Sequence, residues 1–94
     1  MSDPAVDPTI RRLRDEIATA DRAVVGAVNR RLELVAKLKR YKASQGLAFV
    51  DPQQEHRLVA RLLESNPGPL SDDGLRELVG RLLELTKREL AGGG

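Results

Sequence analysis

The sequence predicts an all-α protein with one long helix and two shorter ones. Apolar residues recur at three- and four-residue spacing along most of the chain, which is the period of one helix face. The pairs Asp7-Pro8 and Asp51-Pro52 each join a cap to a proline suited to the first helical position, and Ser71 marks a third helix start. No segment alternates apolar and polar residues in the manner of a strand.

The first helix is expected to run from Asp7-Pro8 to about Ser44, because no proline interrupts this stretch and only Gly26 opposes it. Such length is typical of a coiled-coil-like arm. Apolar residues recur along one face of this helix and form a seam, which requires a partner helix. A chain of 94 residues also buries more apolar surface when it pairs with a second copy. The seam comprises Ile10, Leu13, Ile17, Ala20, Val24, Ala27, Arg31, Leu34, Leu38 and Tyr41.

Two shorter helices follow the loop "SQGLAFV", in which Gly46 is suited to end the long helix. The second helix begins at Pro52 and ends at "SNPGPL". The third follows Ser71, and Leu70 and Leu75 have the spacing of a hydrophobic staple. The apolar faces comprise Leu58, Val59, Leu62 and Leu63 on the second helix, and Leu75, Leu78, Val79, Leu82, Leu83, Thr86 and Leu90 on the third.

Composition narrows the class of protein. We interpret residues 1–94 as one domain, with residues 1–7 and 92–94 frayed. Without cysteine there is no disulfide or thiolate chemistry, and His56 alone makes no zinc site, so no metal is expected. A net charge of +2 with 2% aromatic residues predicts no nucleic-acid partner. The absence of a long apolar run or a signal-like start predicts a soluble, cytoplasmic protein without a membrane partner.

Two cations stand at unexpected places on the long helix. Arg31 falls in the seam, and Lys42 lies eleven residues later, which is about 20° around the axis and roughly 16 Å along it. Their long side chains can lean toward each other over a small anion. The alternative is that Arg31 extends its charge to solvent or pairs with a carboxylate such as Glu33 or Glu55.

Arg14 is a third candidate for binding an anion. It lies about 25 Å from Arg31 on a straight helix, so the two share a small ligand only across an antiparallel partner. The alternative is an exposed arginine that pairs with Asp15 or Glu16. The two-fold crossing would fall among the small residues Ala23, Gly26 and Ala27, which allow close helix packing.

Polar residues on the shorter helices complete the set of candidates. Asp51 is explained by capping, and Glu55 by the positive end of its helix, although Glu55 can also accept a hydrogen bond from a ligand hydroxyl. Thr86 lies on an apolar stripe, where threonine usually bonds its own backbone.

Taken together, Arg14, Arg31, Lys42, Asp51 and Glu55 resemble the site of the all-helical (AroQ-class) chorismate mutases. The resemblance covers nearly the whole chain, and the first three motifs align without a gap. The motifs are "IRRLRDEIATAD", "NRRLELVAKLKRYK", "FVDPQQE", "NPGPLS" and "LLELTKREL".

The resemblance implies an intertwined antiparallel homodimer with two active sites that rearranges chorismate to prephenate, in phenylalanine and tyrosine biosynthesis. By position, Arg31 and Arg14 of the partner subunit would hold the two carboxylates, and Lys42 would face the ether oxygen. Glu55 and the Asp51 backbone would hold the ring hydroxyl. A pericyclic reaction needs no cofactor: it needs a positioned dianion and positive charge at the ether oxygen.

The chain departs from the family's pattern at two positions. Many relatives have arginine where this chain has Gln54, and many have glutamine where it has Leu90. Glu89 is adjacent to Leu90 but is turned by about 100° around the helix. Thr86 matches a family serine near a carboxylate.

Because of these departures, four other functions for the chain remain open. The alternatives are a mutase for 4-amino-4-deoxychorismate, an isochorismate-pyruvate lyase, a mutase that depends on an activating partner enzyme, and a non-catalytic helical interaction module. Glu55 suits a ring hydroxyl or amine, which favours a mutase over the lyase, whereas Leu90 favours the non-catalytic module.

Overall fold

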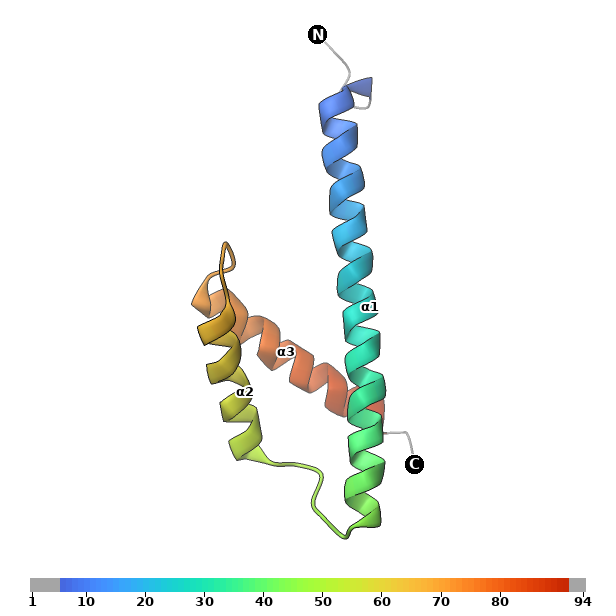
Figure 1. The fold of residues 1–94 in the computed structure, drawn as a ribbon, viewed down its shortest axis with the longest axis vertical. Helices are drawn as coiled ribbons and strands as arrows, with labels where there is room; N and C mark the ends of the chain where they lie inside the picture. Colours follow the sequence, from blue (N-terminus) through green and yellow to red (C-terminus); the bar gives the residue numbers. More distant parts are fainter. Residues whose placement is uncertain (1–5, 92–94) are drawn as a thin grey trace. The chain divides into compact units, whose positions relative to one another are not determined.

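A computed structural model of the chain describes residues 6–91. In this range it contains three helices and no strand: α1 at Pro8–Ser44, α2 at Pro52–Ser65 and α3 at Asp72–Ala91 (Figure 1). The prediction of an all-α chain with one long and two shorter helices is therefore confirmed. Fraying was predicted for residues 1–7 and 92–94. Of these, residues 1–5 and 92–94 lie outside the described residues. Contacts within the chain group it into two units, residues 1–34 and 35–94.

Side-chain caps start all three helices. Asp7 Oδ1 accepts hydrogen bonds from the backbone N–H groups two and three residues ahead, at 2.8 and 3.2 Å. Asp51 Oδ1 does the same at the start of α2, at 3.1 and 3.3 Å. At α3, Ser71 Oγ accepts from the N–H of Gly74 at 3.0 Å. These bonds satisfy donors that the first helical turn leaves unpaired, so short local sequences determine where the helices begin.

The end of α1 is a glycine-terminated turn. Gly46 has a φ of 69°, a left-handed conformation that a residue with a Cβ rarely adopts. The N–H of Leu47 donates to the carbonyl of Lys42 at 2.8 Å, and that of Gly46 donates to the carbonyl of Ala43 at 3.2 Å. This is the bond pattern of a Schellman motif. It turns the chain sharply after α1 and leads it toward α2.

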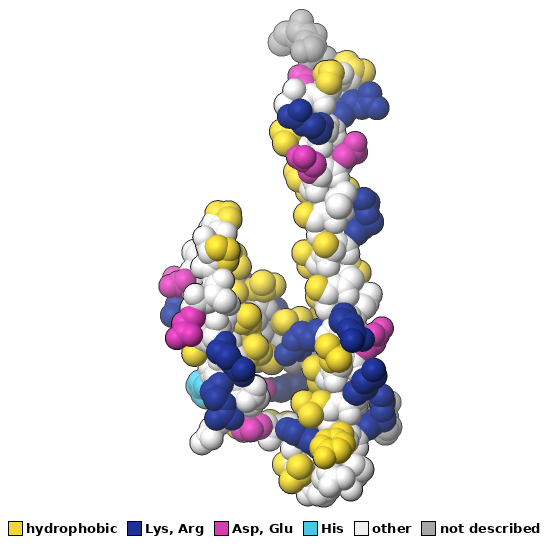
Figure 2. Space-filling model, viewed as in Figure 1, with side chains coloured by type: hydrophobic (Ala, Val, Ile, Leu, Met, Phe, Trp, Pro, Cys, Tyr) yellow, Lys and Arg dark blue, Asp and Glu magenta, His cyan; other side chains and the backbone are white. Residues whose placement is uncertain are grey.

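The described part of the first unit is one helical segment whose apolar side chains are largely uncovered. None of the described residues of α1 is buried. Ile17 and Val24, which belong to the predicted seam, are 59% and 62% exposed. Figure 2 shows hydrophobic side chains along one edge of this segment. The apolar face is thus present as predicted, and the single chain leaves it open.

In the second unit, α2 and α3 pack against each other (Figure 1). The buried apolar side chains among the described residues are Leu75 and Val79, so the core of a single chain is small. Leu70 covers the first turn of α3: its Cδ1 lies only 2.9 Å from the position that a Cβ on Gly74 would take. The second unit therefore combines a small core with a tightly packed α3 start. No helix in the described part of the chain is both long and apolar enough to cross a membrane.

The last turns of α1, which belong to the second unit, carry two different faces. Lys39 and Lys42 are half-buried, whereas the seam residues Leu38 and Tyr41 are exposed. A run rich in lysine and arginine, such as "KLKRYK", usually forms a solvated helix face, and Lys42, which was selected from the sequence, is one exception. Lys39 is a second exception, because it faces the interior of its unit.

Candidate active site

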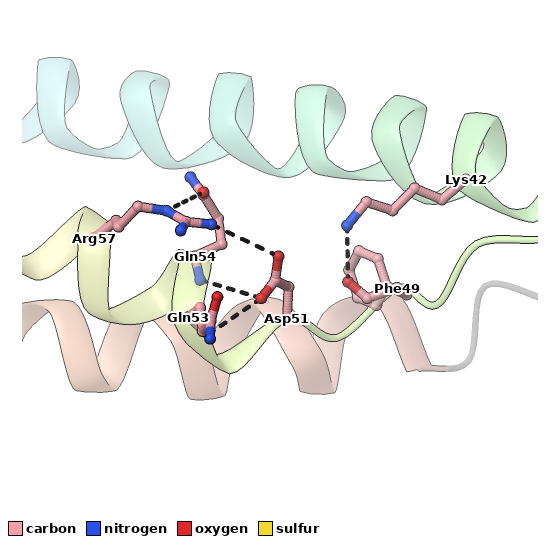
Figure 3. A network of polar contacts seen from close by, with 6 residues as sticks. All are labelled: Lys42, Phe49, Asp51, Gln53, Gln54 and Arg57. Carbon is pink, nitrogen blue, oxygen red and sulfur yellow. Dashed lines mark hydrogen bonds and ion pairs between the residues drawn. The ribbon is translucent and has the colours of Figure 1, made fainter.

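Lys42 is held by the chain segment that follows α1. Its side chain is half-buried, and Nζ donates a hydrogen bond to the carbonyl oxygen of Phe49 at 3.3 Å (Figure 3). An ammonium group has three N–H donors, so one bond to a carbonyl orients the group without exhausting it. The carbonyl is neutral, and the positive charge of Lys42 is therefore positioned without being cancelled by this partner.

Asp51 is the centre of a polar network at the start of α2 (Figure 3). Its carboxylate caps the helix and forms a 3.9 Å ion pair with Arg57 NH2. Arg57 Nε also donates to Gln54 Oε1 at 3.2 Å. Gln54 occupies the position at which many relatives have arginine. The guanidinium bonded to its side chain is that of Arg57, which comes from the next turn of α2. The capping role of Asp51 is thus shown, and its backbone remains the predicted contact to a ring hydroxyl.

Glu55, in the first turn of α2, pairs with a residue that the sequence argument did not select. Its Oε1 lies 3.1 Å from Nζ of Lys87 on α3. The Glu55 side chain is 33% exposed and that of Lys87 is 52% exposed. The pair joins α2 to α3 and fixes the direction of the Glu55 carboxylate.

Thr86 is buried, and its hydroxyl donates to the carbonyl of Leu82 at 2.7 Å. This is the bond to the backbone of its own helix that a threonine on an apolar stripe usually makes. A hydroxyl has a single hydrogen to donate, so contact with a substrate carboxylate requires that the hydroxyl rotate away from Leu82. The predicted role of Thr86 therefore involves a rearrangement on binding.

Lys39 connects α1 to the end of α3. Its Nζ donates to the carbonyl oxygen of Leu90 at 2.9 Å and lies 5.6 Å from the centre of the Phe49 ring. Leu90 is half-buried and Glu89 is exposed. This difference favours Leu90 as the residue at the position of the family's glutamine.

The candidate residues divide between the two units. Lys42, Asp51, Glu55 and Thr86 lie in residues 35–94, on α1, at the start of α2 and on α3. The other two lie in residues 1–34 on α1, where Arg14 is exposed and Arg31 is half-buried.

Sequence reasoning missed two lysines. Lys39 precedes Lys42 by three residues, which places both on one helix face, and this spacing was the available signal. Lys87 follows Thr86 directly, but its pairing depends on how α2 packs on α3, which no local pattern encodes.

Comparison with known proteins identifies the class to which this arrangement belongs. The chain is a member of the chorismate mutase type II family, whose model matches residues 13–89. The resemblance drawn from the sequence motifs is therefore confirmed.

Individual relatives agree with the family assignment. The chain is 31% identical to the T-protein of Haemophilus influenzae over 75 residues, which is 79% of this chain but only 20% of that protein. It thus spans about a fifth of that relative. Two structures of chorismate mutase from Thermus thermophilus, forms I and II, superpose with TM-scores of 0.79 and 0.78 at 29% identity. Each covers 83% of this chain, with 98% of the form I chain and 89% of the form II chain matched.

Proposed function

We propose that this chain is a chorismate mutase, which rearranges chorismate to prephenate in phenylalanine and tyrosine biosynthesis. The observation that carries the proposal is the Lys42 ammonium, half-buried and held on a neutral carbonyl, in a chain whose family match spans residues 13–89. The rearrangement breaks the ether C–O bond while a new C–C bond forms in the same molecule, and negative charge develops on the ether oxygen in the transition state. A preorganised ammonium near that oxygen stabilises the transition state more than the ground state, which raises kcat.

The remaining residues hold the substrate in its reactive shape. Arg31 grips one carboxylate, and its planar guanidinium suits a two-point contact. Glu55 accepts a hydrogen bond from the ring hydroxyl, together with the Asp51 backbone, and Thr86 contacts a carboxylate after its hydroxyl rotates. Holding a flexible dianion in the compact conformer supplies much of the rate enhancement without a nucleophile. This account requires no metal or cofactor.

The same proposal includes a homodimer with shared sites. The exposed seam of α1 and the small core of the second unit support it, since a single chain leaves large apolar side chains such as Ile17 and Val24 open to water. In an antiparallel pair of α1 helices, each site takes Arg14 from one subunit and Arg31 with Lys42 from the other.

A refolding experiment tests both the reaction and the shared site. Arg14→Ala and Arg31→Ala are each expected to be nearly inactive, because each removes a carboxylate contact from both sites. When the two variants are unfolded and refolded together, random pairing makes about half of the dimers mixed. One site in each mixed dimer is then intact and the other lacks both arginines. The mixture should recover roughly a quarter of wild-type chorismate turnover.

Each variant refolded alone is the control, and native mass spectrometry establishes the fraction of mixed dimers. Mixed dimers without recovered activity would contradict the shared site while leaving the reaction intact. Failure of the wild type to turn over chorismate, measured by loss of its ultraviolet absorbance, would overturn the proposed reaction and favour the non-catalytic helical module.

A further inference from the structure

The ion pair between Lys87 and Glu55 is a feature of the second unit that the proposed mechanism does not use. Its two atoms, Lys87 Nζ on α3 and Glu55 Oε1 on α2, lie 3.1 Å apart. Glu55 is the carboxylate that the proposed function assigns to the ring substituent of the substrate. An ammonium in direct contact with it therefore alters what that carboxylate can recognise.

A carboxylate without a counter-ion accepts hydrogen bonds from a neutral hydroxyl and from an ammonium alike, and its charge favours the ammonium. A carboxylate already paired with lysine is different. Its remaining lone pairs still accept from a neutral hydroxyl, since a carboxylate has about four acceptor positions. An incoming ammonium, in contrast, meets a positive charge at short range and gains little from a carboxylate that is already neutralised.

We propose that Lys87 is a specificity-determining residue that selects substrates with an uncharged hydroxyl on the ring over analogues with a protonated amine at the same position. The inference rests on the proposed function, and it decides between chorismate and 4-amino-4-deoxychorismate as substrate. The amine of the latter is largely protonated at neutral pH, so the two molecules differ by one positive charge at the atom that faces Glu55.

A purely structural role for Lys87 predicts a different result. Partly exposed ion pairs contribute little to stability. If Lys87 only helped to join α2 to α3, its loss would change the turnover of both substrates by the same factor. The ratio of the two kcat/KM values therefore separates the two roles, because a general loss of folded protein cancels from it.

The test compares the wild type with Lys87→Met, Lys87→Arg and Arg88→Met on chorismate and on 4-amino-4-deoxychorismate. Lys87→Met removes the charge and keeps most of the side-chain length. Arg88→Met removes an equal charge from the exposed neighbour on the same helix and is the matched control. The wild type should prefer chorismate, and Lys87→Met should reduce this preference at least about tenfold. Lys87→Arg and Arg88→Met should keep it within about twofold of the wild type, since they retain a cation beside Glu55.

An unchanged ratio in Lys87→Met, with chorismate still turned over by the wild type, overturns the inference and leaves the proposed function standing. A wild type that prefers the amine overturns it as well. A wild type that turns over neither substrate overturns the proposed function and this inference with it. Circular dichroism of each variant verifies that the helices are retained.

Discussion

Lys39 is predicted to stabilise the fold by tying the end of α3 to α1, and the size of the effect follows from its contacts. Replacing it with methionine keeps the apolar stem but removes the 2.9 Å bond to the Leu90 carbonyl and the cation above the Phe49 ring. A charged hydrogen bond contributes about 1.5–3 kcal/mol and a partly exposed cation–π contact about 0.5 kcal/mol. Because Lys39 is only half-buried, water screens both contacts, and we expect a loss of about 1.5 kcal/mol, below the lower end of their sum.

Urea unfolding measures this loss directly. With a slope of about 1–2 kcal/mol per molar urea, the midpoint of Lys39→Met should fall by roughly 1 M. Lys37→Met, an equal change at an exposed position of the same helix, is the control and should shift the midpoint by less than about 0.3 M. All samples are compared at one protein concentration, because the stability of a dimer depends on it. Equal shifts in the two variants would refute the stabilising role of the Lys39 contacts.

Two further predictions concern the register of α3 and the seam of α1. Leu90→Gln should raise kcat by placing a donor at the ether oxygen, and an unchanged kcat in a folded variant would show that position 90 does not face the substrate. Val24→Glu should dissociate the dimer in analytical ultracentrifugation, whereas Val25→Glu should not. The two valines are 62% and 60% exposed in the single chain, so equal dissociation by both changes would argue against the predicted seam.

The helices could be predicted from the sequence because short segments determine where they begin and end. Asp7, Asp51 and Ser71 each accept bonds from N–H groups within three residues, and Gly46 ends α1 by its own conformation. Capping residues and terminating glycines act within a few residues of a helix end, so they can be recognised without knowledge of how the helices pack. The helical seam was also visible, because its period is a property of the helix alone.

The polar contacts of the site could not be predicted in the same way. Lys39 meets a carbonyl 51 positions later in the chain, and Lys87 meets Glu55 across two packed helices. Such pairs depend on the tertiary arrangement of α2, α3 and the end of α1. A run rich in lysine and arginine is usually solvated, and only the packing shows that Lys39 points inward. Local spacing therefore selected Lys42 and Glu55 as candidates, while the structure was needed to identify the contacts of Lys39 and Lys87.

The partners of the three lysines distribute charge over the second unit in the way that the proposed function requires. Lys39 and Lys42 donate to backbone carbonyls, which satisfy N–H groups without removing the charge. Lys87 pairs instead with a carboxylate, and that pair has no net charge. The second unit thus keeps positive charge at the end of α1 and neutralises it between α2 and α3. The proposed substrate matches this distribution, since its ether oxygen, which becomes negative in the transition state, would face Lys42, and its neutral hydroxyl would meet the paired carboxylate of Glu55.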